Sequence, residues 1–190
     1  MTKLYPAEGY GVHMRSAVEM EQRIHELEKI PESLRIERLF TGESVASQQY
    51  PSGLGSSLQI EFGPTQVTED MTLDSTGKLT IHNTGLYRIK TALQFGRNNG
   101  GGTASLLMFR ALFDGVQAGR SIAAKLGNAK DTAYLENDEW LELPEGLEIT
   151  YELIRDSSGS DNGGLLMLNS ADGWNSSPTA LIRIQKFTKV

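Results

Sequence analysis

Few side chains in this 190-residue sequence could catalyse a reaction, and they are widely separated. The chain has no cysteine, which excludes thiol nucleophiles, disulfides and thiolate zinc sites. Its histidines, His13, His25 and His82, do not have the spacing of a metal-binding pair. No Gly-x-Ser-x-Gly motif, phosphate-binding loop or dinucleotide-binding glycine pattern occurs. We therefore expect a protein that is not an enzyme and that has no cofactor and no metal.

The densest group of carboxylates lies between residues 136 and 145. Two carboxylates at a suitable distance act as acid and base in glycoside hydrolysis, so a carbohydrate-active enzyme is one hypothesis. A solvated strand edge explains the group better, and we favour that interpretation. The group consists of Glu136, Asp138, Glu139, Glu142 and Glu145.

Two loop segments could bind ligands. Residues 156–164 are rich in Asp, Asn, Ser and Gly, whose oxygen atoms suit calcium, but the same composition forms plain turns and the segment lacks the helix-loop-helix calcium pattern. Trp174 lies between Gly173 and Asn175 and could stack on a sugar from a loop. For these two features we favour a hairpin tip and a packing anchor, respectively.

Composition limits the partners. The formal net charge of −6 and the pI near 5.1 argue against nucleic acid, which is bound by clustered Lys and Arg. No apolar run approaches the length of a membrane span, so we expect no membrane insertion. The polar opening lacks the apolar stretch of a signal peptide, and we expect synthesis in a cytoplasm.

The first 37 residues differ from the rest and are expected to form a separate attachment or trimerisation region. Residues 1–11 combine glycine, proline and aromatic residues, a composition that favours an extended arm ordered by docking. Its apolar anchors are Leu4, Tyr5 and Tyr10.

A short helix is predicted over residues 12–30, before Pro31. Its apolar positions are spaced three, four and three residues apart, which gives a narrow seam. The seam could pair with copies of itself in a parallel coiled coil, or it could dock on its own domain. The seam residues are Ala17, Met20, Ile24 and Leu27.

Residues 38–190 contain short β-runs separated by Gly, Pro, Asn, Asp and Ser, a pattern typical of an antiparallel sandwich or barrel. The predicted strands are residues 38–44, 58–62, 71–73, 78–82, 86–95, 104–113, 116–123, 132–135, 140–143, 147–155, 165–169 and 180–187.

Two predicted strands carry further information. In residues 86–95, Tyr87, Ile89, Leu93 and Phe95 share one face, while Arg88, Lys90 and Gln94 share the other. Residues 104–113 are apolar on both faces apart from Arg110, with Leu107, Phe109 and Phe113 opposed by Leu106, Met108 and Leu112. The second face could be covered by a loop or by the helix. We favour burial against another subunit, because contiguous apolar patches mark interfaces.

The run Gly85-Leu86-Tyr87-Arg88-Ile89, together with residues 135–143, resembles the jelly rolls of the tumour necrosis factor and complement globular-head families. In residues 135–143 the resemblance is to a turn followed by a strand, with acidic turn residues and alternating leucines. The resemblance implies an all-β, antiparallel jelly-roll sandwich that forms a homotrimer without catalytic activity. Lys90 then faces the trimer axis, and it needs an acidic partner, as does Arg88. The expected trimer interface comprises Lys90, Leu106, Met108 and Leu112.

A jelly roll without cysteine, preceded by a helix and a polar arm, resembles surface proteins of tailed-bacteriophage virions. The implied function is a trimeric capsid decoration or head-fibre protein on the virion surface, attached through its arm to capsid or tail proteins. The alternative is a receptor-binding fibre tip whose outer loops, residues 98–102 and 156–164, recognise a host surface glycan.

Overall fold

The computed structural model describes residues 34–97, 104–128, 130–160, 162–169 and 172–189. The expectations for the N-terminal arm and for the helix seam concern residues outside these ranges. They are Leu4, Tyr5, Tyr10, Ala17, Met20, Ile24 and Leu27.

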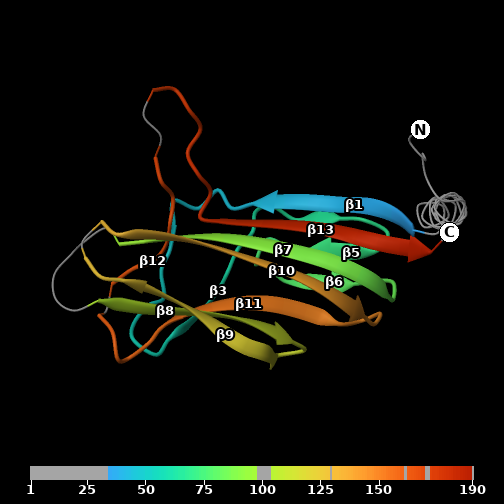
Figure 1. Cartoon of the computed structure of the whole chain (residues 1–190). Helices are drawn as coiled ribbons and strands as arrows, with labels where there is room; N and C mark the ends of the chain where they lie inside the picture. The colour runs from blue at the N-terminus through green and yellow to red at the C-terminus, as the bar shows by residue number, and fades with distance from the viewer. Residues whose placement is uncertain (1–33, 98–103, 129, 161, 170–171, 190) are drawn as a thin grey trace, which may run out of the picture. The chain divides into compact units, whose positions relative to one another are not determined.

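The described residues form an antiparallel β-sandwich without a helix, so the expected all-β class is confirmed (Figure 1). Sheet A contains β1 (Leu34–Glu43), β13 (Ala180–Lys189), β7 (Gly85–Gly96), β12 (Gly164–Leu166) and β2 (Gln48–Gln49), and β10 (Thr132–Leu143) pairs with β7. Sheet B contains β4 (Gln66–Val67), β5 (Met71–Leu73), β6 (Leu79–Ile81), β11 (Glu148–Arg155), β8 (Ser105–Phe113) and β9 (Val116–Leu126), and β3 (Ser57–Gln59) pairs with β11.

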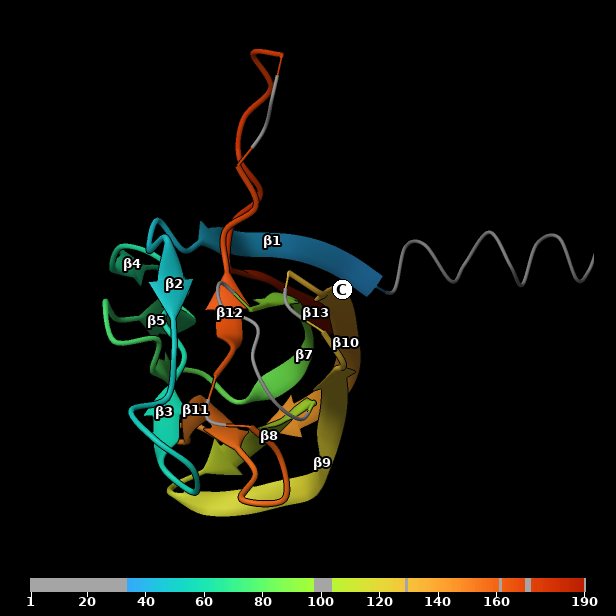
Figure 2. The same ribbon diagram turned by 90° about the vertical axis from the view of Figure 1, so that its left-hand side faces the viewer.

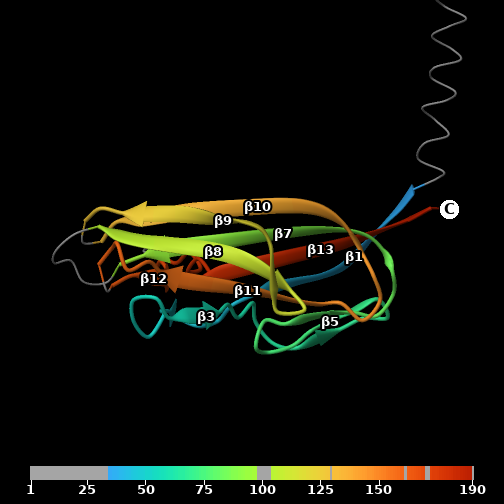
Figure 3. The same ribbon diagram turned by 90° about the horizontal axis from the view of Figure 1, so that it is seen from below.

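The chain passes repeatedly between the two sheets. From β6 in sheet B it enters β7 in sheet A, returns to β8 and β9, crosses to β10, and returns again to β11. Figure 3 shows β8 running between β9 and β11. Neighbouring strands in each sheet are therefore often distant in sequence, as in Greek-key sandwiches.

Most of the sandwich is one compact unit, residues 38–186. The described residues 34–37 and 187–189 belong to a second unit. Within this second unit, the Thr188 hydroxyl donates a hydrogen bond to the backbone carbonyl of Arg35, with an O···O distance of 3.5 Å.

The inward faces of both sheets form one apolar core. Strand alternation places Tyr87 and Ile89 of β7 inside, and Leu107 and Phe109 of β8 are also buried. Tyr151 of β11 stacks on Phe109, with ring centroids 5.5 Å apart. The inward residues predicted for β7 are confirmed.

Strand β10 corrects the predicted chain path. The sequence pattern predicted two strands, residues 132–135 and 140–143, separated by an acidic turn. The structure has a single 12-residue strand, Thr132–Leu143, paired with β7 along its whole length. Glu136, Asp138 and Glu142 alternate along this strand with residues of the opposite face, so their turn preference is overridden by cross-strand pairing.

The described residues between β12 and β13, 167–169 and 172–179, project from the sandwich (Figures 1 and 2). At the base of this segment, the Met167 amide donates to the Ser47 carbonyl at 2.9 Å. An isolated bridge joins Leu168 to Ser177. Trp174 is 82% exposed, so it does not pack on its own chain as an anchor.

Candidate functional site

The outward face of sheet A carries a regular set of charges, because β7 and β10 pair in full register. Arg88 lies opposite Trp140, Lys90 opposite Asp138, and Ala92 opposite Glu136. All six side chains therefore project from the same side of the two strands. We call Arg88, Lys90, Glu136 and Asp138 the charge ladder.

Each cation of the charge ladder binds a carboxylate diagonally across the two strands. Arg88 binds Asp138 through two parallel hydrogen bonds, Nε to Oδ1 at 2.8 Å and Nη2 to Oδ2 at 2.6 Å. Lys90 Nζ lies 2.9 Å from Glu136 Oε2. The acidic partners that the sequence analysis required for Arg88 and Lys90 thus come from the same chain.

The charge ladder holds both of its acids in the ionised form. The hydrogen bonds from Arg88 lower the pKa of the Asp138 carboxyl. The pKa of the Glu136 carboxyl is also lowered, first by Lys90 and then by the Tyr134 hydroxyl, which donates to Oε1 at 2.8 Å. A glycosidase acid needs a raised pKa, so these two carboxyls are unsuited to protonate a leaving group.

Two large aromatic side chains of β10 flank the charge ladder. Tyr134 is 61% exposed and Trp140 is 53% exposed. The Arg88 guanidinium lies over the Trp140 ring at 5.3 Å from its centroid. The face thus combines paired charges with exposed aromatic surface, the residue types that contribute most to binding energy at interfaces.

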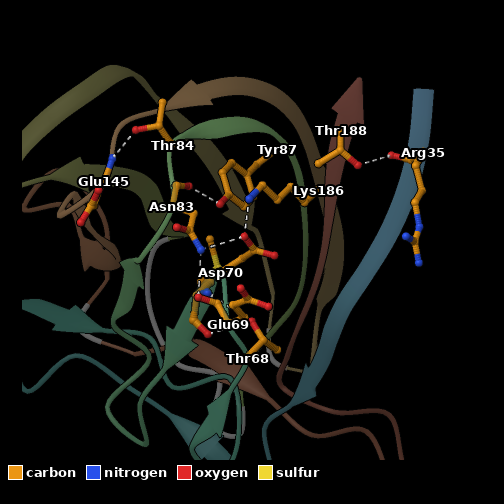
Figure 4. Close-up of polar contacts among 11 residues, drawn as sticks. Arg35, Thr68, Glu69, Asp70, Asn83, Thr84, Tyr87, Glu145, Lys186 and Thr188 are labelled. Carbon is orange, nitrogen blue, oxygen red and sulfur yellow. Dashed lines mark hydrogen bonds and ion pairs between the residues drawn. The ribbon is translucent and has the colours of Figure 1, made fainter. Parts of the chain in front are cut away.

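A partly buried polar cluster fixes the start of β7 (Figure 4). Lys186 of β13 forms an ion pair with Asp70 and lies over the Tyr87 ring, 5.7 Å from its centroid. The Tyr87 hydroxyl donates to the Asn83 carbonyl at 2.5 Å, and Asn83 Nδ2 donates to Asp70 Oδ1 at 3.2 Å. A Cβ at Gly85 would lie 2.9 Å from Lys186 Cε, so a larger residue there would require the Lys186 side chain to shift.

Burial and ion pairing shift the pKa of Lys186 in opposite directions. Burial disfavours its charged form, but the hydrogen bond to Asp70 and the nearby Tyr87 oxygen outweigh burial, so the pKa of Lys186 is raised. Burial also raises the pKa of the Tyr87 hydroxyl. The ammonium therefore stays charged over the whole neutral range.

The residues of the expected trimer interface lie on two different sheets. Lys90 is on the outward face of sheet A, whereas Leu106, Met108 and Leu112 belong to β8 in sheet B. Leu106 and Met108 are half-buried. Leu112 is only 8% exposed within its own chain, and it follows a shift in the pairing of β8 with β9.

The loop and histidine candidates have local roles. Ser158 donates its backbone amide to Asp156 Oδ1 at 2.8 Å, and its hydroxyl binds the same oxygen, so the pKa of the Asp156 carboxyl is lowered. His82 Nε2 pairs with the Thr72 hydroxyl at 2.8 Å. His13 and His25 lie outside the described residues. Among the described ranges, no group of three or more His, Cys, Asp or Glu side chains could hold a metal.

Sequence reasoning missed the charge ladder as a unit. The signal was present, because Arg88 and Lys90 stand two residues apart on one strand and Glu136 and Asp138 stand two apart on another. Joining them required the register of β10, which the predicted acidic turn had broken.

The chain matches no protein-family profile and no curated protein. Among solved structures, it aligns with the structure of Eiger TNF from S. frugiperda over 81% of this chain and 92% of that chain. The TM-score is 0.42 and the sequence identity is 11%. In the described part of the chain, no helix has the length and apolar character needed to cross a membrane.

Proposed function

We propose that this protein is a non-enzymatic structural module that assembles as a homotrimer through the outward face of sheet A. The observation that supports this most directly is the pairing of both β7 cations with carboxylates of the same chain, at 2.6 Å and 2.9 Å. An unpaired charge is costly to bury, whereas a hydrogen-bonded pair tolerates partial burial. The two β7 cations can therefore be covered by another copy without either becoming a lone charge.

Exposed aromatic area on the same face supports the proposal. Tyr134 and Trp140 each leave more than half of their surface uncovered in the single chain. Burial of such rings contributes a large share of the binding energy in protein interfaces. The half-buried Leu106 and Met108 on sheet B offer a second contact surface, as a ring of three subunits requires two different patches on each copy.

Sedimentation of the full chain tests the trimer. We expect the native protein to sediment as a trimer at micromolar concentration. The double variant Tyr134→Ala, Trp140→Ala is expected to dissociate, while Val116→Ala, at a site that is 71% exposed on β9, is expected to remain trimeric. A folded monomer for the native chain would disprove the proposal.

The place of this trimer is, in our proposal, the surface of a tailed-bacteriophage virion, as a capsid decoration or head fibre. The sequence resemblance supports it, and three N-terminal arms on one trimer would attach with high effective concentration. Deletion of residues 1–30 is expected to abolish attachment to purified particles. Wild-type attachment by the deletion variant would contradict the role of the arm.

Trp174 favours a second candidate function, a fibre tip that recognises a host surface glycan. Its indole is 82% exposed on the projecting segment and is followed by Asn175 and Ser176. An exposed ring beside hydroxyl and amide groups suits a sugar, which offers an apolar face and hydroxyl groups. Binding of the full chain to host cells, lost in Trp174→Ala but kept in Val116→Ala, would favour this function.

A further inference from the structure

A groove on the outward face of sheet A is lined by basic residues from three strands. It encloses about 330 Å³ and lies between β1, β13 and β7. Its cations are Arg38, Arg88, Lys90 and Arg183, and its other lining residues are Ile184 and Gln185. No carboxylate is among these lining residues, although the chain as a whole carries a formal charge of −6.

The four cations fall into two pairs with different partners. Arg88 and Lys90 bind the β10 carboxylates, so the charge ladder contributes little net charge to the groove. Within the described residues, the hydrogen-bond acceptor of Arg38 Nη2 is a neutral group, the Thr41 hydroxyl, at 2.9 Å. Among the described residues, no carboxylate lies within ion-pair distance of Arg183, whose charge nevertheless helps to lower the pKa of Glu136.

The groove therefore has an excess of positive charge on its β1 and β13 side. Cations gathered in a concave surface attract anions more strongly than the same charges spread over a convex one. A guanidinium presents parallel N–H donors that match the oxygens of carboxylate, sulfate and phosphate. The ion pairs with β10 hold Arg88 and Lys90 in place on the β7 side of the groove, so that side is preorganised.

We propose that this groove binds a small anion through carboxylate, sulfate or phosphate oxygens, with Arg38 and Arg183 as its main contacts. The volume lies at the lower end of the range for ligand sites, which suits a molecule no larger than an acidic monosaccharide. The Gln185 amide lies at the same groove and supplies a neutral donor for a further oxygen. The groove shares the outward face of sheet A with the proposed trimer interface, and a bound anion would neutralise Arg38 and Arg183 on that face. This inference goes beyond the structural role proposed above and does not depend on a virion.

Titration calorimetry of the full chain at low ionic strength tests the inference. The probes are citrate and glucuronate for carboxylates, sodium sulfate, and inorganic phosphate, with glucose as the neutral control. We expect at least one anion to bind at one site per chain and glucose not to bind. The rank of the four anions identifies which oxyanion the groove prefers, and added salt is expected to weaken binding.

Charge-removing variants locate the site. Arg183→Gln is expected to weaken anion binding by about tenfold, and Arg38→Gln combined with Arg183→Gln by more. Arg120→Gln, at an exposed position of β9, is expected to leave affinity unchanged. Circular dichroism melting of each variant confirms that the fold is retained.

Three outcomes would overturn the inference. They are the absence of binding for all four anions, equal affinity in Arg183→Gln and the native chain, and equal loss in Arg120→Gln and Arg183→Gln. If no anion binds and Arg183→Gln instead dissociates the oligomer, the groove accommodates a carboxylate of a neighbouring copy. Sedimentation of the same samples separates these results from failure of the trimer proposal.

Discussion

The two sheets share one core but present different outward faces. On sheet A, Arg88 and Lys90 point outward and each binds a carboxylate of β10. On sheet B, the outward side of β8 carries half-buried Leu106 and Met108 and one ion pair, Arg110 with Glu152 at 2.6 Å. In both sheets, the alternation of side chains along each strand places apolar residues on the inward face. The outward faces therefore hold most of the information about partners.

The largest expected effect tests which side chains of β8 face the core and which face outward. Leu107→Asp places an unpaired charge at a position with no exposed surface and is expected to prevent folding. Met108→Asp, one residue along on the outward side, is expected to leave a folded protein with weaker assembly. Circular dichroism and sedimentation measure the two properties separately.

Equal behaviour of the two variants would contradict the assignment of the β8 faces. Unfolding of both would mean that Met108 belongs to the core. Normal folding and assembly of both would mean that the sandwich packs differently around β8.

Periodicity was enough to find most strands and to assign the core side of β7. It failed where composition and pairing disagree, as in β10, whose acidic residues suggested a turn. The two-residue strands β2 and β4 are too short to show any period. Their existence depends on partners elsewhere in the chain.

The basic groove could not be predicted for a different reason. Arg38 and Arg183 are far apart in sequence, and they meet because β1 pairs with β13 and β13 pairs with β7. No local pattern encodes this order of strands. The sequence shows which residues are charged. It does not show which residues become their neighbours in the sheet, and these neighbours determine which charges are neutralised.

The next effect in size compares a buried ion pair with the exposed charge ladder. Asp70→Ala removes the carboxylate partner of Lys186, a residue that is only 8% exposed. The loss of one partner from a buried pair costs about 3 kcal/mol, so we expect a marked fall in the free energy of unfolding by urea. Asp138→Ala in the charge ladder is expected to cost the fold of the single chain much less, because Arg88 is partly exposed to water there.

The double variant Asp70→Ala, Lys186→Met serves as the control. It removes both charges and is expected to recover much of the lost stability. If Asp70→Ala and Asp138→Ala destabilise equally, the pair at Lys186 is not effectively buried. The expected difference in stability between ion pairs on the inward and outward faces of sheet A would then be wrong.

The smallest expected effect is the acid sensitivity of the charge ladder. The folded-state pKa values of Asp138 and Glu136 are lowered, so their contribution to stability is complete above the ordinary carboxyl pKa, roughly 4. It is lost as the pH falls through the lowered values. The double variant Asp138→Asn, Glu136→Gln is therefore expected to show a flatter fall of unfolding free energy with acid than the native chain, and added salt is expected to reduce the difference.

Glu142→Gln is the matched control for the acid experiment. Glu142 projects from the same outward side of β10, opposite Leu86, and the described residues give it no ion pair. Its removal is expected to leave the acid profile nearly unchanged, because no described Lys or Arg forms an ion pair with its carboxylate. If Glu142→Gln flattens the profile as much as the double variant does, then general acidity of the strand, and not diagonal pairing with Arg88 and Lys90, governs this face. The charge ladder would then not act as a preorganised wall of the basic groove. The outward faces of the two sheets would differ only in amino-acid composition.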